Sequence, residues 1–181
     1  MARLRTAVLI SGRGSNLQAL LAAAAAPDYP AEIALVLSDE PAAAGLGAAA
    51  AAGVAARAVP RRDFPDKAAF EQALEAALQE AAIGLVCLAG FMRVLSPEFC
   101  RRWEGRMINI HPSLLPAFPG LDTHARALAA GVRASDAARD PRIWAGTPNH
   151  GRGKRKMVIV YPYPVVSFCL FEYMLRKLLI Y

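Results

Sequence analysis

Short apolar runs alternate along the chain with segments in which apolar residues recur every three or four positions. The apolar runs contain β-branched residues and end near Gly, Ser or Pro, a pattern that predicts β-strands. We expect strands at residues 6–10, 33–37, 54–59, 83–89 and 107–110. We expect helices at residues 17–26, 42–52, 67–82, 97–103 and 124–130. This alternation predicts an α/β fold built on a doubly wound, mainly parallel sheet.

Local signals indicate where these helices begin and end. Ser15 or Asn16 is the expected N-cap of the first helix, and Gly53 is well placed to stop the second. The third helix, at residues 67–82, is the clearest because its apolar residues have the spacing of one buried stripe. Three carboxylates of that helix are expected to lie off the stripe. These are Glu71, Glu75 and Glu80.

Three loops are expected at one edge of the predicted sheet. They are residues 12–16, 90–95 and 109–116, and each follows a predicted strand. In a doubly wound sheet, ligands bind beyond the carboxyl ends of the strands. We therefore expect the functional site where these three loops meet.

The first loop has the composition of a phosphate-binding turn. Its residues, Ser11-Gly-Arg-Gly-Ser-Asn16, lie between a strand and a helix. Glycines let the backbone approach an anion, and the helix start offers free N–H groups and a positive dipole end. Leu17 stands where a dinucleotide fingerprint needs its third glycine, so a phosphorylated small molecule is favoured over NAD. The alternative is a tight strand-to-helix turn with a serine cap.

The other two loops carry an apolar pair and a polar pair. Phe91 and Met92 beside a strand end would make a flat slot for a heteroaromatic ring, with core packing as the alternative. Asn109 and His111 stand on alternate positions of an extended strand and point to the same side. An amide and an imidazole placed together suit carbonyl chemistry. The alternative is a histidine that hydrogen-bonds a backbone carbonyl.

Composition narrows the location and the partners. Cys87, Cys100 and Cys169 are scattered without metal-ligand spacing, so we expect no metal and a cytoplasmic, reducing location. The apolar stretches are too short or too interrupted for a signal peptide or a membrane span, so no membrane role is expected. Residues 134–181 carry +5 of the net charge of +6, so the basic excess belongs to the tail and says little about the main domain, and no nucleic-acid partner is expected.

Three motifs in order resemble one enzyme family. They are S-G-x-G-S-N, L-A-G-F-M-R-V-L-S and I-N-I-H-P-S-L-L-P-x-F-P-G-L-x-T-H. Together, over about residues 6–131, they resemble phosphoribosylglycinamide formyltransferase, the folate-dependent enzyme of purine biosynthesis. N-x-H-P-S-L-L-P marks the wider formyltransferase superfamily, and the phosphate loop with P-G-L-x-T-H narrows it to this member. The resemblance implies a Rossmann-like formyltransferase fold.

The resemblance also implies a reaction and its residues. The formyl group of 10-formyltetrahydrofolate, a co-substrate, would pass to the amine of 5-phosphoribosylglycinamide. Substrate binding is assigned to Gly14, Ser15 and Asn16. Folate contacts are assigned to Lys67, Met92, Arg93, Val94, Leu95 and Asn109. Catalysis is assigned to Asn109 and His111.

The chemistry of formyl transfer suits those two catalytic residues. Negative charge develops on the formyl oxygen, and a fixed donor there commonly contributes ~2.7–4 kcal/mol. Asn109 can supply one hydrogen bond, and protonated His111 can supply another and deliver a proton to the leaving nitrogen. An imidazole is mostly neutral at pH 7, so a nearby carboxylate is needed to favour its charged form.

That carboxylate is where the sequence departs from the family. The family has an Asp roughly three dozen residues after the His, whereas Asp136 and Asp140 here do not match its motif. We therefore divide the chain into a formyltransferase domain, residues 1–133, and a divergent, atypical tail, residues 134–181. The tail is either a frame-shifted segment or a genuine one that forms its own strands. A sheet without the family's last strands would expose an edge and an apolar face, which predicts poor solubility.

Two other functions remain open from the sequence. One is a different folate formyl enzyme, such as methionyl-tRNA formyltransferase or formyltetrahydrofolate deformylase. The phosphate loop argues against the first, and the lack of an amino-terminal regulatory domain argues against the second. The other is a non-catalytic remnant that binds nucleotide or folate. The sequence does not indicate an oligomeric state.

Overall fold

The computed structural model describes residues 2–110 and 158–160. Its elements are β1 (Leu4–Ile10), α1 (Ser15–Ala24), β2 (Ala31–Ser38), α2 (Ala44–Ala51), β3 (Ala55–Ala58), a 3₁₀ turn (Arg61–Asp63), α3 (Lys67–Glu80), β4 (Leu85–Ala89), α4 (Pro97–Arg102), β5 (Met107–Ile110) and β6 (Val158–Val160). Five strands and four helices thus appear with ends within two residues of those predicted. The predicted helix at residues 124–130 lies outside the described residues.

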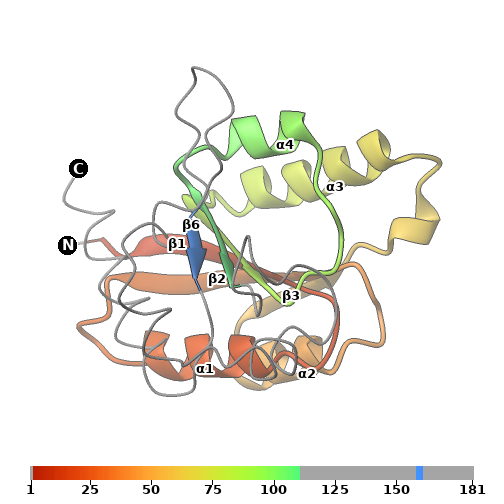
Figure 1. Ribbon diagram of the computed structural model, residues 1–181. Helices are drawn as coiled ribbons and strands as arrows, with labels where there is room; N and C mark the ends of the chain where they lie inside the picture. Colours follow the sequence, from red (N-terminus) through yellow and green to blue (C-terminus); the bar gives the residue numbers. More distant parts are fainter. Residues whose placement is uncertain (1, 111–157, 161–181) are drawn as a thin grey trace, which may run out of the picture.

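The strands form one six-stranded sheet in the order β3-β2-β1-β4-β5-β6, and every neighbouring pair is parallel. The helices α1 and α2 cover one face of the sheet, and α3 and α4 cover the other (Figure 1). The winding reverses between β1 and β4, and such sheets bind ligands at that switch point. The predicted doubly wound, mainly parallel fold is confirmed.

Strand β1 is buried on both faces and supplies side chains to two cores. Val8 and Ile10 belong to the core on the α1 side, where Leu17 of α1 is also fully buried. Leu9 belongs to the opposite core, together with Phe70 of α3. Burying a large apolar side chain contributes ~1.5–3 kcal/mol. Because helices cover both faces, the strand is a continuous apolar run rather than an alternating one.

Helix α1 begins earlier than predicted, and glycine rather than a side chain stands at its start. The N-cap is Gly14, whose φ of 75° lies in the left-handed region, and Ser15 is already the first helical residue. The prediction that Ser15 or Asn16 caps the helix was therefore wrong. Glycine adopts this conformation at no steric cost, which lets the chain turn sharply from the loop into the helix.

The carboxylate of Glu71 is buried, contrary to the prediction that it lies off the apolar stripe of α3. The residue is only 7% exposed. Glu71 precedes the buried Leu74 by three positions and Leu78 by seven, so all three lie on one face of the helix. The error came from judging the residue by its charge rather than by its position.

One segment of the tail joins the sheet. Strand β6 runs parallel to β5 and pairs Val158 with Ile108 and Val160 with Ile110. Over this length β5 is paired with β4 on one side and β6 on the other. Pairing satisfies backbone groups that an edge strand would expose. This pairing agrees with the alternative in which the tail forms its own strands.

Candidate functional site

The first two predicted loops meet at the carboxyl edge of the sheet through Ser11. The backbone N–H of Ser11 donates to the carbonyl of Gly90 at 3.1 Å. The Ser11 hydroxyl accepts a hydrogen bond from the N–H of Met92 at 2.8 Å. The third loop starts beside them, because β5 pairs with β4 in a register that sets Asn109 opposite Leu88. The structure therefore brings the start of all three loops to one edge.

The phosphate-type loop depends on a close approach between two glycines. The N–H of Gly45, at the start of α2, donates to the carbonyl of Gly12 at 3.2 Å. A Cβ atom added to Gly14 would lie 2.8 Å from the Cα of Gly45, a contact too short for real atoms. Ser15 is exposed and Asn16 half-buried, so both side chains can reach a ligand. The first-turn amides of α1 have no intrahelical partners, which suits them to an anion.

The second loop divides its apolar side chains between the core and the surface. Phe91 and Leu95 are partly buried against the core of Phe70, which matches the packing alternative for Phe91. Met92 and Val94 are 78% and 85% exposed, although both are large and apolar. Two such side chains beside the end of β4 provide an apolar surface that suits a flat ring.

Arg93 forms an ion pair with Asp39, a buried carboxylate that was not predicted from the sequence. Asp39 directly follows β2 at the same sheet edge, and its Oδ2 accepts a hydrogen bond from Nε of Arg93 at 2.5 Å. Asp39 is only 4% exposed, whereas the Arg93 side chain is half-exposed. Within the described ranges, Oδ1 of Asp39 has no hydrogen-bond partner. Its position after a buried strand was the signal that could have identified Asp39 as part of a fourth loop.

We predict that Arg93→Ala lowers the free energy of unfolding by ~1.5–3 kcal/mol, the range for a hydrogen bond to a charged group. The loss follows because Asp39 would keep a buried carboxylate without its cation. Adding Asp39→Asn to Arg93→Ala should recover part of the lost free energy of unfolding, because mutations at contacting residues do not have additive effects. Urea unfolding measures both effects. The control is Arg101→Ala, whose ion pair with Glu98 is exposed, so its loss should lower the stability much less than Arg93→Ala does. Equal losses for Arg93→Ala and Arg101→Ala would contradict the prediction.

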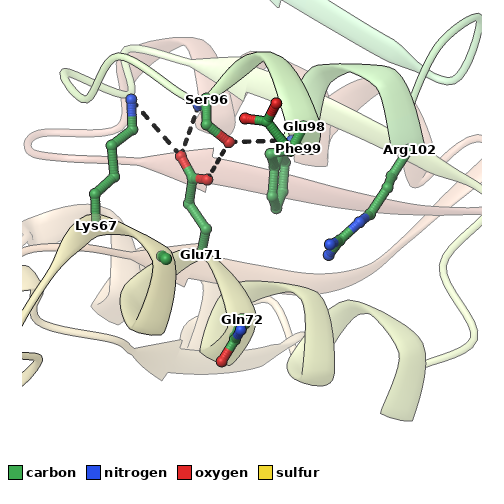
Figure 2. Close-up of a pocket in the computed structure, with 8 residues that line it drawn as sticks. Lys67, Glu71, Gln72, Ser96, Glu98, Phe99 and Arg102 are labelled. Carbon is green, nitrogen blue, oxygen red and sulfur yellow. Dashed lines mark hydrogen bonds and ion pairs between the residues drawn. The ribbon is translucent and has the colours of Figure 1, made fainter.

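Lys67 lies at the edge of a pocket between α3 and α4. The pocket has a volume of about 270 Å³. Lys67 is the first residue of α3, and its Nζ lies 3.9 Å from Oε1 of Glu71 (Figure 2). Glu71 in turn bonds to Ser96, the residue that follows Leu95. The ammonium group of Lys67 and the residue at the end of the second loop therefore contact the same carboxylate, although they are far apart in the sequence.

The third loop contributes one described residue to the site. Asn109 is half-buried on β5, one residue before the strand ends at Ile110. The structure therefore supports placing its amide at the sheet edge. His111, the predicted catalytic imidazole, lies outside the described residues, as do the acidic residues of the tail.

Neither thiol among the described residues is suited to act as a nucleophile. Burial raises the pKa of Cys87 to about 12. The pKa of Cys100 is raised by burial and by the charge of Glu71, with Lys67 acting in the opposite direction. A raised pKa keeps a thiol protonated at neutral pH, and the thiolate is the reactive form.

The described part of the chain has neither a metal-ligand cluster nor a helix that could span a membrane. Residues 2–110 and 158–160 contain no cluster of three or more His, Cys, Asp or Glu side chains that could hold a metal ion. Among the helices of those same ranges, none combines the length and the apolar character needed to cross a bilayer.

Comparison with known proteins assigns the chain to a family. The formyl transferase family model matches residues 4–137. The phosphoribosylglycinamide formyltransferase of Haemophilus influenzae is 42% identical over 127 residues, which are 70% of this chain and 60% of that protein. The trifunctional purine biosynthetic protein adenosine-3 of Bos taurus is 49% identical over 128 residues, 71% of this chain but 13% of that protein. The chain thus spans only part of these curated relatives.

A solved structure gives the same result. The phosphoribosylglycinamide formyltransferase of Brucella melitensis is 54% identical and superposes with a TM-score of 0.70. The match covers 72% of this chain and 68% of that one. The chain belongs to the formyl transferase family and groups within it with the phosphoribosylglycinamide formyltransferases.

Proposed function

We propose that this chain transfers the formyl group of 10-formyltetrahydrofolate to the amine of 5-phosphoribosylglycinamide. The junction at Ser11 is the observation that supports the proposal best. It joins a loop suited to phosphate and a loop with an exposed apolar surface at the switch point of the sheet. A phosphorylated amine and a flat pteridine ring need these two surfaces side by side. Membership of the family supports the same pairing of ligands.

The proposed roles follow from the position of each residue. Gly14, Ser15 and Asn16 bind the phosphoribosyl group at the start of α1. Residues 92–95 and Lys67 bind the folate. Asn109 donates a hydrogen bond to the formyl oxygen as negative charge develops there. His111, once protonated, donates to the same oxygen and returns a proton to the folate nitrogen as that nitrogen leaves.

We propose that residues 1–133 form the catalytic domain and that residues 134–181 are a divergent tail. The family match ends at residue 137, which supports a boundary in this region. Sequencing the gene tests the origin of the tail. If a neighbouring reading frame encodes the family's motif around the missing Asp, the tail is a frame shift. If no frame does, the tail is genuine, and the pairing of β6 with β5 favours that alternative.

The experiment that tests the function is the release of tetrahydrofolate in the presence of 5-phosphoribosylglycinamide. We expect a rate far below that of the Haemophilus influenzae relative measured alongside, because the family's Asp is missing from the tail. Release that does not depend on the glycinamide substrate would indicate a deformylase. Binding of both ligands without any release would indicate a non-catalytic protein. A rate equal to that of the relative would mean that another group replaces the carboxylate.

We also propose that the protein acts in the cytoplasm on small molecules. Its three scattered cysteines suit a reducing compartment, and its proposed ligands are intracellular metabolites. The reaction requires no metal, and neither nucleic acid nor a membrane is among the expected partners. Fractionation of cells that express the chain tests the location.

A further inference from the structure

A carboxylate at a core-facing position of α3 requires an explanation. Glu71 is 7% exposed and shares its helix face with Leu74 and Leu78. A carboxylate taken out of water is costly unless it is paired and hydrogen-bonded. A leucine at this position would bury more apolar surface and avoid that cost. Glu71 must therefore contribute through the groups to which its carboxylate is hydrogen-bonded or paired.

Both oxygens of Glu71 bind the same residue at the start of α4. Oε1 accepts the backbone N–H of Ser96 at 2.7 Å, and Oε2 accepts the Ser96 hydroxyl (Figure 2). The Ser96 oxygen in turn accepts the N–H of Phe99 at 3.1 Å. Because Ser96 supplies both protons, both oxygens of Glu71 act as acceptors, as in an ionised carboxylate. The ammonium group of Lys67 lies 3.9 Å away and offsets this charge.

Ser96 is the exit of the second loop, so Glu71 completes a set of three ties. The entry of the loop is held by Ser11, and its middle by the pair of Arg93 with Asp39. The exit is held by Glu71, which lies one helical turn after Lys67 on the same helix. One side chain therefore contacts both the ammonium group of Lys67 and the exit of the loop.

We propose that Glu71 is a positioning residue for folate binding, which holds Ser96 and thereby fixes the spacing between Lys67 and residues 92–95. Glu71 does not touch the folate itself. The inference rests on the proposed function, because folate is the ligand assigned to Lys67 and to that loop. The experiments below separate the failure of one from the failure of the other.

The direct test is Glu71→Gln, which keeps the shape of the side chain but leaves one acceptor oxygen for two donors. In the full chain, the Kd for 5-formyltetrahydrofolate, a stable formyl folate, should rise about tenfold, equivalent to ~1.4 kcal/mol. The Kd for 5-phosphoribosylglycinamide should stay within about twofold, because its loop lies on β1 and α1. Calorimetric titration measures both constants. Equal loss of both affinities, or loss of neither, would overturn the inference.

The matched control is Glu75→Gln, one turn further along α3. Its carboxylate also accepts two hydrogen bonds, from Trp103 Nε1 at 2.8 Å and from Gln79 at 2.8 Å. It therefore ties α3 to the far end of α4, away from the loop. Glu75→Gln should leave the folate affinity unchanged. A fall in affinity equal to that of Glu71→Gln would show a general α3–α4 packing effect and overturn the positioning role.

Hydrogen exchange gives a readout that needs no ligand. Glu71→Gln should speed amide exchange in residues 91–96 much more than in residues 11–17, which bond to that loop only through Ser11. Equal effects on both segments, or unchanged exchange in both, would overturn the inference. Ser96→Ala should weaken folate binding as Glu71→Gln does. Ser96→Thr keeps the hydroxyl, so it should bind folate like the wild-type chain. Failure of both expectations would also count against the inference. If the wild-type chain does not bind 5-formyltetrahydrofolate, the proposed function fails, and exchange alone decides whether Glu71 orders the loop.

Discussion

Replacing Gly14 with alanine should raise the Kd for 5-phosphoribosylglycinamide at least tenfold, equivalent to ~1.4 kcal/mol. Two costs combine at this position. A φ of 75° is unfavourable for any residue with a Cβ, by roughly 1–2 kcal/mol. The new Cβ would also lie 2.8 Å from the Cα of Gly45, where backbone must move because no flexible side chain can give way. Moving either backbone displaces the amides that are proposed to bind the phosphate.

Gly53 isolates the first of these costs. Gly53 has a φ of 71° but open space around its Cβ position, so Gly53→Ala carries only the conformational cost and lies away from the loop. We expect this variant to keep the wild-type Kd within about threefold, well under the ~1.4 kcal/mol of a tenfold change. The prediction for Gly14 fails if Gly53→Ala weakens binding as much.

Replacing Asn109 with alanine should lower the rate of formyl transfer by ~10²–10³, the usual effect of removing one fixed donor from a developing oxyanion. The side chain of Asn109 is half-buried at the end of β5, and a hydrogen bond is stronger there than in bulk water because the local dielectric constant is lower. The interaction strengthens as charge develops, so the ground-state Kd for the folate should change much less. Single-turnover measurements with saturating ligands give the rate of the chemical step directly.

Asn109→Asp is the companion variant, since it keeps the size of the side chain but replaces the donor by an acceptor. Its charge would oppose the charge of the formyl oxygen, so its rate should be at least as low as that of Asn109→Ala. A transfer rate within about threefold of wild type for either variant, a difference well under ~1.4 kcal/mol, would remove Asn109 from the catalytic machinery.

The fold could be predicted because its signals are local and repeated. Each buried strand, such as residues 83–89, is an apolar run, and the clearest helix, residues 67–82, shows one apolar stripe at helical spacing. The parallel arrangement of the strands then follows from the alternation of strands and helices. The N-cap at Gly14 was missed because the neighbouring Ser15 and Asn16 are the residue types preferred at an N-cap. The close approach of Gly14 to Gly45 of α2 is not visible in any window of sequence.

The site was predicted only in part, for a related reason. Motif residues such as Asn109 can be read directly from the sequence. Asp39 and Glu71 cannot, because their importance comes from partners 54 and 25 positions away. Charged residues are mostly exposed, so local reasoning assigned Glu71 to the surface. Only the packing of α3 against the start of α4 reveals that its carboxylate has two donors to accept.

The shared bonds of Ser11 have a consequence for the order in which ligands bind. Its backbone holds the second loop at Gly90 and its hydroxyl holds the same loop at Met92, while its neighbours form the phosphate-type loop. A ligand that stiffens one loop therefore removes part of the entropy that the other loop must lose on binding its own ligand. By linkage, each ligand must raise the affinity of the other by the same factor. We expect positive cooperativity between amine and folate in calorimetric titrations, and it should weaken in Ser11→Ala, which loses the hydroxyl bond to Met92 but keeps the backbone bond to Gly90.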